Sequence, residues 1–198
     1  YRSELENRSI HKLWGKGKPF YAVYDIGTYT FAPYKVVWKR IAGGITGKAV
    51  SFACTVVEPV NGKSVIPDDS TILAEVDIPE EAYYLAGVLN STAVRATVAS
   101  YTYELRQETH IIDVIKVPKF DPNNPIHKKI AELSKKAHEL AKCIYSKEKP
   151  NYCDNIKNPR EELKKVEKEI DLAVAQLFGL TEEELEEMEK LMSILSGE

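Results

Sequence analysis

The chain has 198 residues, of which 43% are hydrophobic and 29% charged, and its formal net charge is −3. This composition is typical of a folded protein with a core, and it excludes an intrinsically disordered chain. No apolar run approaches the roughly 20 residues that span a bilayer, and no basic segment followed by an apolar stretch marks a signal peptide. We therefore expect a cytoplasmic protein without a membrane partner. Because the chain begins at Tyr1 rather than Met, we also expect a piece of a longer polypeptide.

The first part of the chain predicts a helix, a turn and a series of short strands. Residues 2–13 favour a helix that ends in glycine-rich turn material at residues 15–19. The dipeptide Asn61-Gly62 predicts a hairpin turn. Spacing and β-branched residues predict strands over residues 20–25, 34–41, 48–57 and 71–78.

After residue 78 the apolar spacing becomes helical. Pro79 opens a helix that breaks near Asn90, and Ser91 can cap a second helix that runs to Tyr101. Residues 110–117 again favour a strand.

From residue 126 the pattern is entirely helical. Apolar residues recur at spacings of three and four over residues 126–144 and again over residues 163–177, with Pro150 between the two runs. Thr181 and Glu184 form a capping box for a last helix.

Together these elements predict an α+β fold: a mixed, mostly antiparallel twisted sheet with short helices, followed by a C-terminal antiparallel helical hairpin. The expected domains are residues 1–121 and residues 122–198, the latter a hairpin or spacer with an acidic C-terminal helix. Residues 1–120 carry 14 Lys/Arg and 13 Asp/Glu, whereas residues 121–198 carry 13 and 17. The acidic charge is therefore concentrated in the second part.

The cysteines and histidines point to no metal or disulfide site. Cys54, Cys143 and Cys153 are odd in number and include no CxxC pair, which argues against a disulfide framework or a zinc knuckle and favours a reducing cytoplasm. His127 and His138 lie on one predicted helix without a further ligand, so we interpret them as solvated.

Residues 31–40 (FAPYKVVWKR) are rich in aromatic and basic side chains. No acidic residue occurs between Asp25 and Glu58. Cations beside aromatic rings suit a surface that meets phosphates and base edges. The alternative is an ordinary strand with Val36 and Trp38 inward and its lysines solvated.

Catalytic motifs are absent from the sequence. Gly43, Gly44 and Gly47 do not have the GxGxxG spacing of a dinucleotide or S-adenosylmethionine fold, and no P-loop is present. Asp68, Glu75 and Asp77 could hold Mg²⁺ in a nuclease, although exposed turn and edge charges explain them as well. We expect that this chain is not itself an enzyme.

Three blocks in register resemble one family. They are residues 31–40, residues 80–91 (EEAYYLAGVLNS) and residues 117–138 (VPKFDPNNPIHKKIAELSKKAH). In this order they resemble the C-terminal target recognition domain of adenine-N6 DNA methyltransferases of the TaqI-like and type IIG restriction–modification kind. The last block also resembles type I specificity subunits. The resemblance covers about residues 20–145.

The resemblance implies a specificity domain that binds double-stranded DNA and selects where a separate domain methylates adenine. That catalytic domain would lie N-terminal to this chain and bind S-adenosylmethionine, and no cofactor is expected here. Its signature of Asn or Asp, two prolines and an aromatic residue has no counterpart in the sequence. By the same resemblance, the helices of residues 126–178 would pack on another domain or in a dimer. Helices that pack only on each other are the alternative.

The expected DNA contacts are basic or aromatic residues of the predicted strands and loops. They are Tyr34, Lys35, Lys39, Arg40, Lys48, Lys63, Arg95 and Arg106. Two other functions remain open: a protein-interaction module that uses the C-terminal helices, and a nuclease built on Asp68 and Glu75. The target sequence, a nuclease domain in the parent protein and the oligomeric state are not fixed by the sequence.

Overall fold

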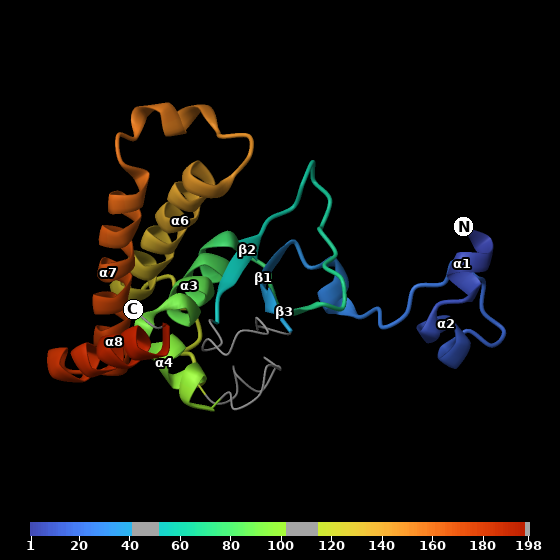
Figure 1. The fold of residues 1–198 in the computed structure, drawn as a ribbon, viewed down its shortest axis with the longest axis horizontal. Coiled ribbons are helices and arrows are strands. Elements are labelled where there is room, and N and C mark those ends of the chain that lie inside the picture. Colours follow the sequence, from blue (N-terminus) through green and yellow to red (C-terminus); the bar gives the residue numbers. More distant parts are fainter. Residues whose placement is uncertain (41–51, 102–114, 197–198) are drawn as a thin grey trace. The chain divides into compact units, whose positions relative to one another are not determined.

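A computed structural model describes residues 1–40, 52–101 and 115–196 of the chain. The chain divides into two compact units, Tyr1–Phe31 and Ala32–Glu198. The second unit contains a three-stranded antiparallel sheet and helices, including those at the C-terminal end (Figure 1). This confirms the predicted α+β class. The boundary expected near residue 121 falls inside the second unit.

The first unit consists of α1 (Arg2–Glu6), α2 (Ser9–Trp14) and the short 3-10 helix η1 (Thr28–Phe31). The single helix predicted over residues 2–13 is therefore wrong, because Arg8 between α1 and α2 has extended backbone angles. The guanidinium of Arg8 donates to the carbonyls of Leu5, Phe20 and Ala22 at 3.0–3.1 Å. The predicted strand over residues 20–25 is also wrong, since its carbonyls bond to an arginine and not to a neighbouring strand.

The sheet of the second unit has the order β2-β1-β3 and begins with β1 (Tyr34–Lys39). Both β2 (Cys54–Val57) and β3 (Thr71–Val76) pair with β1 in antiparallel fashion. The hairpin turn predicted at Asn61-Gly62 is confirmed. Its two residues have φ angles of 51° and 72°, as Asn-Gly favours in a tight turn, and Val60 bridges Lys63.

One face of this sheet packs on α3 (Pro79–Asn90), which lies between the sheet and the C-terminal hairpin (Figure 1). Val36 and Trp38 belong to the core on this face. Gly87 allows α3 to approach α6 (Pro125–Tyr145) closely, because a Cβ there would lie 2.7 Å from Cγ2 of Ile130 and 3.0 Å from Cβ of Ser134.

The helix α3 ends at Asn90, and α4 (Thr92–Tyr101) follows after Ser91, as predicted. Two side chains accept hydrogen bonds from donors at the N-terminus of α4. The Ser91 hydroxyl accepts from the amide of Val94 at 3.4 Å, and the carboxylate of Asp171 accepts from both the amide and the hydroxyl of Thr92, at 2.6 and 2.8 Å.

The C-terminal part contains α6 (Pro125–Tyr145), the 3-10 helix η2 (Asn151–Asn155), α7 (Pro159–Phe178) and α8 (Glu182–Ser196). The helices α6 and α7 form the predicted hairpin (Figure 1). The predicted capping box is confirmed, since the Thr181 hydroxyl accepts from the Glu184 amide and the Glu184 carboxylate accepts from the Thr181 amide. None of the described helices is long and apolar enough to cross a membrane.

Two further predictions are corrected. Residues 110–114 of the strand predicted over 110–117 lie outside the described residues. Ile115 is helical and Lys116 lies in a turn with a φ of 49°, so the strand is wrong for these two. A disulfide joins Cys143 of α6 to Cys153 of η2. Sequence spacing did not indicate this pair, because the chain must turn back after α6 to bring the two Cα atoms within 5.4 Å.

Candidate nucleic-acid interface

The exposed cations Lys39 and Arg40 end the central strand of the sheet. The amide of Arg40 donates to the carbonyl of Ser70 at 2.9 Å, so the pairing with the β3 side continues one residue past Lys39. Ser70 is itself held in a turn, because its amide donates to the Asp68 carboxylate at 3.0 Å. Neither cation forms an ion pair with a residue of the described ranges. The end of β1 therefore presents two adjacent positive charges on fixed backbone.

Lys35 does not fit the expected role of a DNA contact. Its side chain is 1% exposed, and its ammonium donates to the carbonyl of Ala32 at 2.6 Å. Burial lowers the pKa of Lys35, and Glu75, its partner in the register of β1 and β3, acts in the opposite direction. A buried ammonium beside a carboxylate cannot reach a phosphate in this conformation. We therefore withdraw Lys35 from the set of DNA contacts.

The aromatic side chains of β1 belong mainly to the core. Trp38 is 2% exposed, and its ring centroid lies 6.0 Å from that of Phe52. Tyr34 is half-buried and packs against the core. The interpretation of Trp38 as a core residue is confirmed, and Tyr34 remains a predicted contact at the opposite end of β1 from Lys39.

The remaining predicted contacts are not gathered around Lys39 and Arg40. Lys63 is exposed, but the chain leaves β2 at Val57, opposite Lys35, before it reaches the turn that carries Lys63. Lys48 and Arg106 lie outside the described residues. Among the cations that the structure describes, only Lys39 and Arg40 from the predicted set lie next to each other in the chain.

Arg95 lies in a groove of about 900 Å³ whose walls come from β2, α3, α4, α6, α7 and α8. Glu167 and Asp171 line the same groove. Burial raises the pKa of both carboxyl groups, and Arg95 acts to lower them. This cation is thus placed among carboxylates, which weighs against a contact with phosphate.

The acidic residues considered for a nuclease do not form a metal site. Hydrogen bonds from Ser70 lower the pKa of Asp68, whose carboxylate organises the turn before β3. Glu75 lies towards the other end of β3, beside Lys35 in the register. Across the described part of the chain, no three His, Cys, Asp or Glu side chains are grouped so that they could hold a metal ion.

The outer edge of β2 is closed by two side chains that the sequence pattern did not reveal. The Asn90 amide accepts from the Cys54 N–H and donates to the Cys54 carbonyl, both at 2.9 Å. The Nε2 atom of His138 accepts from the Val56 N–H at 3.2 Å. These contacts attach the edge strand to α3 and α6, and His138 is half-buried rather than solvated as predicted.

The three sequence blocks meet in one packed centre. Tyr84 of the second block donates its hydroxyl to the carbonyl of Pro118 at 3.0 Å. Its ring centroid lies 4.6 Å from that of His127, which is buried rather than solvated as predicted. The first block supplies Val36 and Trp38 to the same core cluster as Tyr84.

Comparison with known proteins found no matching family model, no matching curated protein and no matching solved structure.

Proposed function

We propose that this chain recognises duplex DNA for an adenine-N6 methyltransferase or restriction–modification enzyme and is not catalytic by itself. The observation that carries the proposal is the pair Lys39 and Arg40, exposed at the end of β1 within a stretch of sequence that has no acidic residue from position 26 to 57. The resemblance of the three blocks supports it, since all three contribute to one core.

In this function the chain supplies sequence choice while another domain supplies chemistry. Flipping an adenine out of the duplex costs a few kcal/mol. The contacts that offset this cost must therefore form only at the target site of the enzyme. Each good bidentate contact from a side chain such as Arg40 to a base edge contributes about 1–3 kcal/mol of discrimination. The catalytic domain that binds S-adenosylmethionine would be a partner.

This function would place the chain in the cytoplasm with cellular DNA. Thiols are kept reduced there, whereas the structure joins Cys143 and Cys153 in a disulfide, which weighs against this compartment.

The test compares duplex DNA binding by the 198-residue chain and by the Lys39→Ala/Arg40→Ala variant over a series of salt concentrations. The slope of log affinity against log salt changes by about 0.9 for each phosphate that the protein no longer neutralises. We expect the slope to become shallower by up to about 2 in the variant. The matched control is Lys147→Ala/Lys149→Ala, which removes two exposed charges from the segment after α6. Equal slopes for the two variants would show that Lys39 and Arg40 do not contact DNA phosphates.

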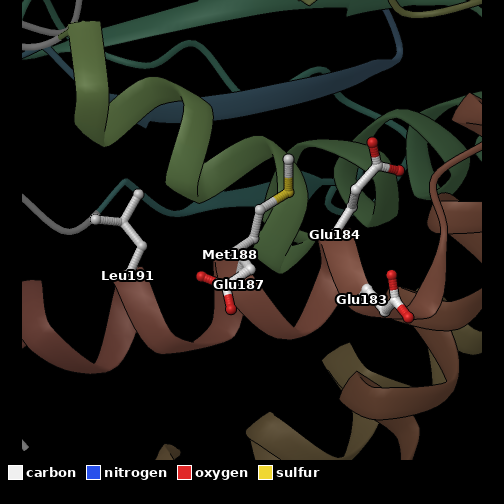
Figure 2. A pocket seen from close by; sticks show the side chains of 5 residues that line it. All are labelled: Glu183, Glu184, Glu187, Met188 and Leu191. Carbon is white, nitrogen blue, oxygen red and sulfur yellow. The ribbon is translucent and has the colours of Figure 1, made fainter.

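A second candidate function is that of a protein-interaction module that uses the C-terminal helix α8. Met188 and Leu191 line a shallow apolar hollow together with Glu183, Glu184 and Glu187, and Figure 2 shows Met188 and Leu191 projecting to the same side of the helix. A second copy of the chain would bring the same carboxylates face to face, so a cationic amphipathic partner fits this surface better than a dimer. If the chain binds a cationic amphipathic peptide, if this binding persists in Lys39→Ala/Arg40→Ala, and if Leu191→Asp abolishes it, this function is favoured.

A further inference from the structure

The first unit carries a cationic segment that the DNA contacts proposed above do not include. Residues 8–24, here called the basic segment, contain Arg8, Lys12, Lys16 and Lys18 but no Asp or Glu. The segment comprises all of α2 and the chain that follows it. A surface of this composition attracts polyanions, because no neighbouring carboxylate in the segment neutralises its charge.

The basic segment is folded back on itself by side chains other than its lysines. Arg8 donates to the carbonyls of Phe20 and Ala22, each at 3.1 Å. The Nδ1 atom of His11 lies 2.7 Å from the hydroxyl of Tyr24. These contacts tie the returning chain to the start of α2, so the turn between them has a defined position within this unit.

The turn itself is closed by backbone hydrogen bonds. The Gly15 amide donates to the His11 carbonyl at 2.7 Å, and the Lys18 amide donates to the Gly15 carbonyl at 2.8 Å. Gly17 has a φ of 78°, a left-handed conformation that favours glycine. The lysines at positions 16 and 18 therefore flank a tight turn.

The side chains that this turn presents are exposed. Lys12, Lys16 and Lys18 are exposed and form no ion pair with any residue in the described ranges. The ammonium of Lys18 lies 5.1 Å from the centroid of the Tyr24 ring, a contact that brings no anion to it. Three cations are thus available to an external anion.

Two aromatic rings accompany these cations at the surface. Trp14 is 66% exposed and Tyr21 is 65% exposed. Leu13, next to Trp14, is also exposed. Large rings are usually buried, and exposed rings beside cations are typical of surfaces that bind nucleic acid.

We propose that the basic segment is a second nucleic-acid contact of this chain. Lys12, Lys16 and Lys18 bind the phosphate backbone, and Trp14 and Tyr21 pack against the sugars of the backbone. The inference rests on the proposed function, because the partner is the same DNA. Its role is different: phosphate contacts hold the duplex irrespective of its sequence, whereas Lys39 and Arg40 contribute to the choice of site.

The ligand chemistry distinguishes DNA from an anionic membrane. An amphipathic helix that lies in a membrane interface buries one apolar face along its whole length. The helix α2 has 6 residues, and its lysines continue into the tight turn at Gly17. Phosphates spaced along a polymer suit this arrangement better than a lipid surface.

The experiment uses the complete 198-residue chain with a duplex of arbitrary sequence labelled for fluorescence anisotropy. The Lys12→Ala/Lys16→Ala/Lys18→Ala variant is compared with a control that removes three exposed charges elsewhere, Lys147→Ala/Lys149→Ala/Lys157→Ala. The slope of log affinity against log salt should become shallower by up to about 3, since each neutralised phosphate contributes about 0.9 to it. The control should keep the slope of the unaltered chain. Equal slopes for the two triple variants would overturn the inference.

The tryptophans provide a second, independent signal. The chain has two, and Trp38 is 2% exposed, so quenching by acrylamide reports mainly on Trp14. DNA should quench this fluorescence and protect it from acrylamide, and the Trp14→Phe variant should not show the response. Unchanged quenching at saturating DNA would overturn the contact of Trp14 with DNA. Equally tight binding to phosphatidylserine vesicles at the same phosphate concentration would overturn the choice of DNA.

The result separates this inference from the function on which it rests. If Lys39→Ala/Arg40→Ala weakens binding and the triple variant of the basic segment does not, only the inference fails. If the triple variant alone weakens binding, the inference stands and Lys39 and Arg40 lose their role. If the unaltered chain shows no salt-dependent binding to duplex DNA, both fail.

Discussion

His138 is held in one tautomer by the two elements that it joins. Its Nδ1 atom lies 2.7 Å from the carbonyl of Ser134, which can only accept a hydrogen bond, so Nδ1 carries the proton. Its Nε2 atom accepts from the N–H of Val56 and therefore has no proton. Protonation of Nε2 would place two N–H groups against each other and detach the edge of β2 from α6.

The pKa of His138 is lowered, first by burial and secondarily by Lys142, while the Ser134 carbonyl and Glu58 act to raise it. Since the folded pKa lies below the unfolded value of about 6.5, the unfolded chain binds more protons between the two values. The stability contributed by neutral His138 is therefore present above pH 6.5 and is lost as the pH falls towards the folded pKa. One group changes the unfolding free energy by at most about 1.4 kcal/mol per pH unit. At pH 5.5 the loss is thus at most about 1.4 kcal/mol.

The measurement is urea unfolding between pH 7.5 and 5.0, followed by circular dichroism, for the unaltered chain and for His138→Gln. Glu167 and Asp171 have raised pKa values and contribute in the opposite direction at lower pH, so the difference between the two proteins isolates His138. We expect the difference in unfolding free energy to shrink as the pH falls below 6.5. A difference that is independent of pH would refute the tautomer assignment, which histidine NMR can also read directly.

Two more substitutions test the packing around the same strand edge. Asn90→Ala leaves the N–H and carbonyl of Cys54 without their partner, so urea unfolding should show a loss of about 2–6 kcal/mol, at about 1–3 kcal/mol for each group; a loss well below 1 kcal/mol would contradict the pairing. Gly87→Ala places a Cβ 2.7 Å from Cγ2 of Ile130 and should lower the unfolding free energy by about 1–3 kcal/mol, and an unchanged urea midpoint would contradict the close approach of α3 and α6.

Several helix boundaries were readable from the sequence because local chemistry sets them, although the break at Arg8 was not. Pro79 and Pro159 open helices, and Gly179 ends one in a left-handed conformation. Tight turns behave in the same way, as the positive φ angles at Asn61 and Gly62 show. These signals act within a few residues, so tertiary contacts did not override them.

Features that depend on tertiary contacts were not readable. Alternation predicted a solvated Lys35, yet Lys35, Val36, Val37 and Trp38 are all buried, so both faces of β1 are covered there. The strand pattern at residues 20–25 failed because Arg8, distant in sequence, takes the carbonyls. The candidate site was only partly predictable for the same reason. Charge and spacing identified Lys39 and Arg40, but charge and spacing could not show which neighbouring cations are accessible.

The carboxylate of Asp171 completes the start of α4 from 79 residues further along the chain. During synthesis, α4 must wait for α7 to emerge before its first amide gains this partner. We expect α4 to form late in folding. An engineer who transplants α4 to a new fusion would therefore have to carry α7 with it, because a shortened version would leave the amide of Thr92 without its acceptor.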